Sequence, residues 1–256
     1  MLEIRSENGI AVVELKRGKA NALDVDFCKV LKKEFRRLAK SDARAVVLTS
    51  KGKIFSAGVD LPRAAEGGRS YLRALVLALD EMYEELFYFP KPLVAAINGH
   101  AIAGGAVLAC CADYRVLAKD AGRMGVTELL VGVPFPPFAF EVLRATTSPV
   151  HFPNFTASGE TFDTQGALQN GFADEAVNAD RLMARAIEKA QQLAAIRLEA
   201  FAANKRHLRV GARQILKNDR GSLAKQIMKV WEAKETIENI RAYVARTLGK
   251  TGAKKS

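Results

Sequence analysis

Short apolar runs separated by a turn signal predict a β-hairpin at the start of the chain. Residues 2–4 and 10–15 carry strand-forming apolar side chains, and Asn8-Gly9 stands between them. This dipeptide favours the tight turns that join two antiparallel strands. We therefore expect the first two strands here.

Helical and strand-like periods then alternate. Apolar residues recur at helical spacing over 25–38, and Asp24 precedes them as a possible N-cap. Apolar runs at 45–48 and 93–97 predict two buried strands, with a helix expected over 71–87 between them. The resulting β-α-β-α-β order indicates an α/β domain.

From residue 179 onward the pattern becomes almost entirely helical. Helices are expected over 182–198 and 201–216, followed by one that Ser222 caps and that continues to residue 248. This change of pattern places a boundary near residue 195. It predicts a mixed α/β core over residues 1–195 and a helical module over residues 196–256.

Composition limits the class of protein. The chain has 256 residues, of which 49% are hydrophobic and 26% charged, so fibrous and wholly disordered classes are excluded. The longest weakly polar stretch, residues 101–112, is shorter than the roughly 18 residues of a membrane span, and the N-terminus lacks a secretory signal pattern. We expect a cytoplasmic protein that does not cross a membrane. Its three cysteines are expected to be buried, and no metal site is predicted.

The charge balance indicates the sign of a partner. A formal net charge of +11 should attract polyanions or phosphorylated ligands. A solvated helical surface, a phosphate-bearing cofactor and a nucleic acid would each account for it. Aromatic residues make up only 7% and are not interleaved with the basic ones, so nucleic-acid binding is the least favoured.

Two glycine-containing segments follow predicted strands. They are Phe55-Ser-Ala-Gly-Val-Asp-Leu61 and Asn98-Gly-His-Ala-Ile-Ala-Gly-Gly-Ala-Val-Leu108. Small residues let the backbone approach a ligand closely, and a helix beginning near Gly104 would present unpaired N–H groups to an oxyanion. Tight packing of a helix on a sheet also selects glycine and alanine, so the pattern leaves both interpretations open.

Together the two segments resemble the crotonase superfamily, the enoyl-CoA hydratase/isomerase family, over residues 2–248. Lys19-Ala-Asn-Ala-Leu23 is similar to the family's first CoA-contacting loop, residues 55–61 to its second, and residues 96–115 to its longest signature. The resemblance implies a spiral of ββα units with a C-terminal helical trimerisation module. It also implies a homotrimer or a hexamer, an acyl-CoA thioester substrate, and no cofactor beyond the CoA of that substrate.

The same resemblance implies the site residues. The backbone N–H groups of Val59 and Gly104 would hold the thioester oxygen, and Glu128 would transfer the proton. The residues implied to contact CoA are Lys19, Ala20, Ala22, Ala57, Gly58, Val59, Asp60, Leu61 and Gly104. Asp113 is expected to have a structural role as the cap of a turn.

The carboxylates suggest which reaction occurs. Hydratases of the family carry one glutamate three residues after the oxyanion-hole glycine and a second about twenty residues later; here these positions hold Val107 and Glu128. Moving a double bond needs a single base, as in the family's Δ3,Δ2-enoyl-CoA isomerases, which this pattern resembles. The run Phe135–Phe138 is expected to wall the acyl pocket and to raise the pKa of Glu128.

Other readings remain open from the sequence. The chain could be a hydratase or catalyse other crotonase-type acyl-CoA chemistry, and a non-catalytic or RNA-binding relative is the least favoured. Glu128 could instead be a loop carboxylate paired with Arg123 or Arg144.

Overall fold

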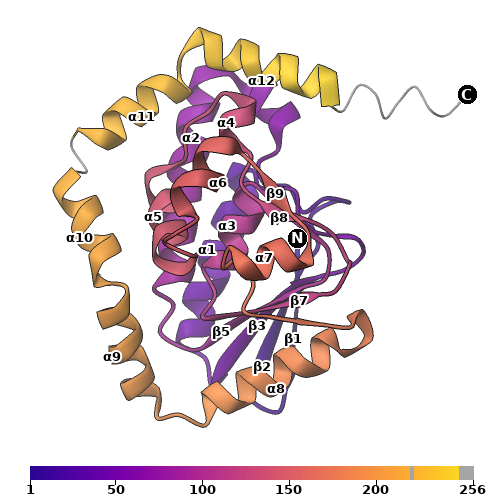
Figure 1. The fold of residues 1–256 in the computed structure, drawn as a ribbon. Helices are drawn as coiled ribbons and strands as arrows, with labels where there is room; N and C mark the ends of the chain where they lie inside the picture. Colours follow the sequence, from indigo (N-terminus) through magenta and orange to yellow (C-terminus); the bar gives the residue numbers. More distant parts are fainter. Residues whose placement is uncertain (220–221, 248–256) are drawn as a thin grey trace, which may run out of the picture.

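Each repeating turn of the chain supplies one strand to each of two sheets and then a helix. The computed structural model describes residues 1–219 and 222–247. Its three central turns are β3 (Ala45–Ser50), β4 (Ile54–Ser56) and α2 (Leu61–Phe87); β5 (Leu93–Ile97), β6 (His100–Ile102) and α3 (Gly104–Cys110); and β7 (Tyr114–Ala118), β8 (Met124–Gly125) and α4 (Glu128–Val131). The predicted spiral of ββα units is confirmed (Figure 1).

The larger sheet has the strand order β1-β2-β3-β5-β7-β10, and the smaller has β4-β6-β8-β9. The elements not yet given are β1 (Leu2–Glu7), β2 (Ile10–Leu15), α1 (Val25–Ala39), α5 (Pro137–Thr146), α6 (Phe152–Ser158), β9 (Thr161–Phe162), α7 (Thr164–Gln169) and β10 (Glu175–Val177). Strands β1 and β2 pair antiparallel across Asn8-Gly9, so the predicted hairpin is confirmed. Strands β2, β3, β5, β7 and β10 pair in parallel. The chain must therefore cross over between them, and most crossovers carry a helix.

Helix α1 begins where the sequence predicts it, because Asp24 accepts a hydrogen bond from the N–H of Phe27 at 2.7 Å. Helix α2 begins ten residues earlier than expected. Its first turns, capped by Asp60, are separated from the predicted part by a kink at Gly68, whose φ of 66° is non-helical. Glycine tolerates this conformation, and it interrupts the apolar period on which the prediction relied.

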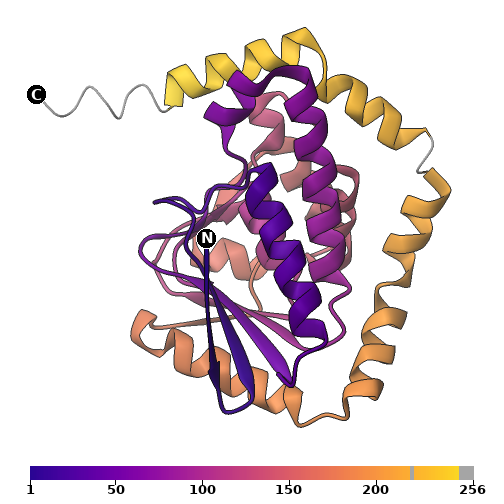
Figure 2. The ribbon, with the colours of Figure 1, turned by 180° about the vertical axis from the view of Figure 1, so that it is seen from behind.

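Helices cover both faces of the larger sheet. Helices α1 and α2 lie side by side on one face (Figure 2), and their apolar residues form the main core together with α3 and α5. Helix α8 (Leu182–Ala194) covers the other face, where its alanines pack against β3, β5 and β7. Cys28, Cys110 and Cys111 are buried free thiols, as predicted.

The C-terminal helices form an arc along one side of the core (Figure 1). They are α9 (Leu198–Leu208), α10 (Val210–Asp219), α11 (Leu223–Trp231) and α12 (Lys234–Thr247), so the two long helices predicted here are each divided. Ser222 precedes α11 but makes no side-chain capping bond. Residues 220–221 and 248–256 of the predicted helical module lie outside the described residues.

A buried ion-pair cluster fastens this arc to the core. Asp113 contacts Lys205 at 2.7 Å and Arg209 at 2.9 Å, and it accepts a hydrogen bond from the N–H of Leu93 at 2.9 Å. Turn capping, the role expected for Asp113, is therefore only part of what this residue does. Its carboxylate also links the start of β5 to Lys205 in α9 and to Arg209 directly after α9. Two of the basic residues near the C-terminus are therefore buried rather than part of a solvated surface.

Candidate active site

The two glycine-containing segments meet at a largely apolar cavity of about 400 Å³. Its walls come from the loop between β2 and α1, the loop after β4, helices α2 to α5 and the C-terminal helices. The lining residues that the sequence singled out are Ala20, Ala22, Ala57, Val59, Asp60, Leu61, Gly104 and Glu128. Gly58 does not line the cavity although its neighbours do, and the exposed side chain of Lys19 lies outside it.

The backbone N–H of Val59 points away from Leu23, the residue with which Val59 forms an isolated parallel bridge. Leu23 donates to the carbonyl of Gly58 at 2.7 Å and accepts from the N–H of Asp60 at 3.0 Å. In a parallel bridge of this kind the residue between the two partners turns its own N–H to the opposite side. Within residues 1–219 and 222–247 this N–H has no acceptor, which leaves it available to a ligand.

The N–H of Gly104 is presented by an unusual turn. Ala103 has a φ of 50°, a conformation that costs an L-residue energy, and α3 starts directly after it. The first N–H groups of a helix have no partner within the helix. In the described chain the N–H of Gly104 likewise has no acceptor, so both N–H groups are free beside one cavity.

Gly58 allows the glycine-containing segment 55–61 to lie directly against the second one, residues 98–108. Its φ is 82°, and a Cβ placed on it would lie 2.8 Å from the carbonyl oxygen of Ile102 and 3.0 Å from the nitrogen of Gly104. Both the backbone conformation and the contact distance exclude a larger residue. Glycine at this position therefore brings the peptide of Val59 next to that of Gly104.

Glu128 is the buried carboxylate of the cavity. It begins α4, its exposure is 7%, and its Oε2 atom has no hydrogen-bond partner among the described residues. Burial raises the pKa of Glu128 to about 7, because a carboxylate loses hydration in an apolar setting. The pairing with Arg123 or Arg144 that the sequence left open does not occur: Arg123 bonds Thr161, and Arg144 bonds Glu141.

Asp60 is the other acidic residue that lines the cavity. Its carboxylate accepts a hydrogen bond from the N–H of Arg63 at 3.1 Å and caps α2. This bond gives it a structural task that Glu128 lacks.

The expected apolar wall is only partly correct. Of the run Phe135–Phe138, Pro136 alone lines the cavity, and Val131, Val133 and Ala139 supply the rest of that side. The fully buried Val107 packs in the core and does not line the cavity.

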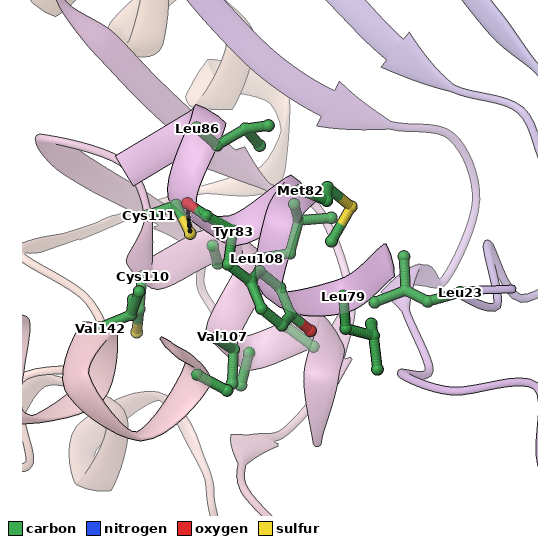
Figure 3. Close-up of a cluster of buried hydrophobic side chains, with 14 of the residues drawn as sticks. Leu23, Leu79, Met82, Tyr83, Leu86, Val107, Leu108, Cys110, Cys111 and Val142 are labelled. Carbon is green, nitrogen blue, oxygen red and sulfur yellow. Dashed lines mark hydrogen bonds between the residues drawn. The ribbon is translucent and has the colours of Figure 1, made fainter. Parts of the chain in front are cut away.

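Sequence reasoning missed three lining aromatics. Tyr83 is fully buried, and its hydroxyl donates to the carbonyl of Gly104 at 2.9 Å; Figure 3 shows this hydroxyl directed toward the side of Leu79 and Leu23. Trp231 and Tyr243 reach the cavity from α11 and α12. The apolar periodicity of the sequence predicts that all three residues lie on helices, but it does not indicate that they meet at one cavity.

Known proteins resemble this chain in sequence and in fold. The family model "Enoyl-CoA hydratase/isomerase" matches residues 5–248. The mitochondrial enoyl-CoA delta isomerase 1 of Rattus norvegicus is 29% identical over 73% of this chain, and a probable enoyl-CoA hydratase of Mycobacterium bovis is 30% identical over 67%. The matched parts span 65% and 66% of those two relatives, less than two thirds of their length.

A solved structure matches nearly the whole chain. The human mitochondrial delta3-delta2-enoyl-CoA isomerase superposes with a TM-score of 0.92 at 25% identity, covering 98% of this chain and 99% of that one. A spiral of ββα units with two free N–H groups beside a buried carboxylate is the arrangement expected of a crotonase-type protein. The chain belongs to the enoyl-CoA hydratase/isomerase family.

Two other kinds of feature are absent from residues 1–219 and 222–247. No group of three or more histidine, cysteine or acidic side chains could hold a metal ion. Nor does any described helix combine the length and the apolar character that a membrane crossing needs.

Proposed function

We propose that this protein is an enoyl-CoA isomerase that moves a 3-enoyl double bond to the conjugated 2-position of a CoA thioester. The observation that carries the proposal is the buried carboxylate of Glu128, whose Oε2 atom has no hydrogen-bond partner among the described residues, in a cavity that also exposes the N–H groups of Val59 and Gly104. The isomerases among the related proteins support it. CoA enters as part of the substrate, and the reaction needs no further cofactor.

The chemistry follows from the groups present. The two N–H groups donate hydrogen bonds to the thioester oxygen and stabilise the charge that develops on it when a C2 proton leaves; one such donor contributes about 3–4 kcal/mol. Glu128 takes the C2 proton as a general base, and the electron pair of the broken C2–H bond enters a dienolate whose charge rests on the thioester oxygen. When the protonated Glu128 returns the proton, the pair of the former C3–C4 double bond forms the new C4–H bond, the carbonyl is restored and the double bond lies between C2 and C3. A pKa of about 7 suits both directions of this transfer.

Hydration is the second candidate, because the family includes hydratases. Adding water across a double bond is easiest when two groups orient the water. Val107 cannot be the second group, and Asp60 is engaged at the start of α2. The cavity therefore favours isomerisation over hydration.

We further propose that the protein assembles as a homotrimer or as a hexamer. The C-terminal helices leave several large apolar side chains exposed, namely Leu208, Val210, Ile215, Leu223 and Val230. Of these, Ile215 and Leu223 line the same apolar cavity, and apolar exposure gathered in this way is typical of surfaces that contact a partner. Sedimentation analysis of the purified protein should give a mass three or six times that of one chain, and a monomer would contradict this proposal.

The test of the activity is a spectrophotometric assay on 3-enoyl-CoA thioesters, with products identified by mass. Wild-type protein should form conjugated 2-enoyl-CoA, and Glu128→Gln should lose at least about a hundredfold in kcat, the low end expected for a general base. Glu160→Gln, at an exposed glutamate, is the matched control and should retain full activity. A 3-hydroxyacyl-CoA as the main product would favour the hydratase, and an active Glu128→Gln would remove the assigned base.

A further inference from the structure

Trp231 lies on a C-terminal helix and forms one wall of the cavity that Glu128 also lines. It belongs to α11, is 2% exposed, and donates its indole N–H to the carbonyl of Pro134 at 3.0 Å. Large aromatic side chains fixed by a hydrogen bond make rigid walls, because few rotamers remain open to them. Trp231 is therefore a fixed boundary of the space around Glu128.

A second apolar cavity of about 390 Å³ lies behind this boundary. Along the segment 133–136, Val133 and Pro136 line the first cavity, whereas Pro134 and Phe135 line the second. Helix α11 shows the same division: Trp231 lines the first cavity, and Ile227, one turn earlier, lines the second. Segment 133–136 and α11 thus form a partition between the two spaces.

We propose that Trp231 sets the upper limit of acyl chain length and makes medium-chain thioesters the preferred substrates, an inference that rests on the proposed function. At roughly 30 Å³ for each water-sized group, a cavity of about 400 Å³ holds roughly 13 non-hydrogen groups. The thioester and the adjoining part of CoA occupy some of them. This leaves an acyl chain of roughly ten carbons or fewer.

Removal of the indole should shift this limit. Trp231→Ala takes away both the wall and the hydrogen bond to Pro134, so the space gained adjoins the partition and the second cavity. Longer chains should then fit. Trp231→Phe keeps a ring and should shift the limit less, whereas Lys225→Ala alters an exposed side chain on the same helix and should not shift it.

Binding of saturated acyl-CoA thioesters tests this inference apart from any reaction. Calorimetric titration with butanoyl-, octanoyl-, dodecanoyl- and hexadecanoyl-CoA should show the tightest binding by wild type near octanoyl-CoA. Hexadecanoyl-CoA should bind at least about tenfold more weakly, the penalty typical of even one methylene that does not fit. In Trp231→Ala that penalty should fall severalfold or disappear.

The outcomes separate the two proposals. Hexadecanoyl-CoA binding to wild type as tightly as octanoyl-CoA, or an unchanged length profile in a folded Trp231→Ala, overturns the role of Trp231. The length profile supports that role even when 3-enoyl-CoA is not isomerised, and in that case only the proposed reaction fails. Absence of binding by every acyl-CoA overturns both. Trp231→Phe provides the same comparison where the alanine variant does not fold.

Discussion

Replacing Glu128 by glutamine should make the protein more stable at pH 8 while it removes the proposed base. The carboxylate is 7% exposed, and its Oε2 atom has no hydrogen-bond partner in the described residues. Ionising it in the folded state therefore has a cost in free energy that the unfolded chain does not bear. The amide of glutamine has nearly the same shape and carries no charge at any pH of interest.

The magnitude follows from the pKa. Burial raises the pKa of Glu128 from 4.5 to about 7, and each tenfold change in a proton equilibrium corresponds to about 1.4 kcal/mol. The product is about 3 kcal/mol, an upper bound because any relaxation of the folded state around the ionised carboxylate lowers this cost.

The sign is set by proton binding. Between pH 4.5 and about 7 the folded state holds a proton that the unfolded state has released, so the contribution of Glu128 to stability falls as pH rises through this window. Below pH 4.5 both states are protonated and the full contribution is present. Above pH 7 both are ionised and the loss is complete.

Denaturant unfolding of wild type and Glu128→Gln at pH 4.5, 6 and 8 would measure this difference. Protein concentration must be equal throughout, since subunit association shifts apparent stability. The free energy of unfolding of Glu128→Gln relative to wild type should rise by up to about 3 kcal/mol from pH 4.5 to pH 8. Glu160→Gln should show no such trend. A pH-independent difference would refute the buried, unpaired state of this carboxylate.

Four further results are expected. The kcat/KM for 3-enoyl-CoA should rise with pH and level off above about 7, because the base must be ionised; a profile that levels off near pH 5 would contradict the raised pKa of Glu128. Tyr83→Phe removes the hydroxyl that holds the carbonyl of Gly104 and should lower kcat about tenfold with little change in KM, which steady-state kinetics would show. Gly58→Ala should abolish turnover and weaken acyl-CoA binding, because its Cβ would meet the Ile102 carbonyl at 2.8 Å; wild-type kinetics would refute that reading. Asp113→Ala leaves Lys205 and Arg209 buried without their carboxylate, so chemical unfolding should show a loss of about 3–5 kcal/mol.

Local sequence patterns determined much of the secondary structure. The hairpin turn at Asn8-Gly9, the cap at Asp24 and the buried strands predicted at 45–48 and 93–97 depend on neighbouring residues, and the structure has all of them, with the first strand extending to Ser50. The start of α2 was not, because its first turns precede the glycine kink at Gly68 and share no continuous apolar period with the rest of the helix.

The sequence predicted the site only through its two glycine-containing segments and through the resemblance to the family. Resemblance singled out Glu128 and the peptides of Val59 and Gly104, and the structure brings all three to one cavity. The unpaired state of the Glu128 carboxylate depends on which residues surround it in space, and no local pattern records that.

Tertiary structure alone decided what surrounds the site. Tyr83 and Trp231 look like ordinary core residues in the sequence, yet one holds the peptide of Gly104 and the other, 103 residues after Glu128, closes the cavity. Asp113 likewise meets Lys205 and Arg209 only because the C-terminal part of α9 lies against the residues that directly precede β5 and β7. Contacts between residues so far apart depend on how helices dock, and apolar periodicity specifies which face of a helix is buried but not which partner it meets.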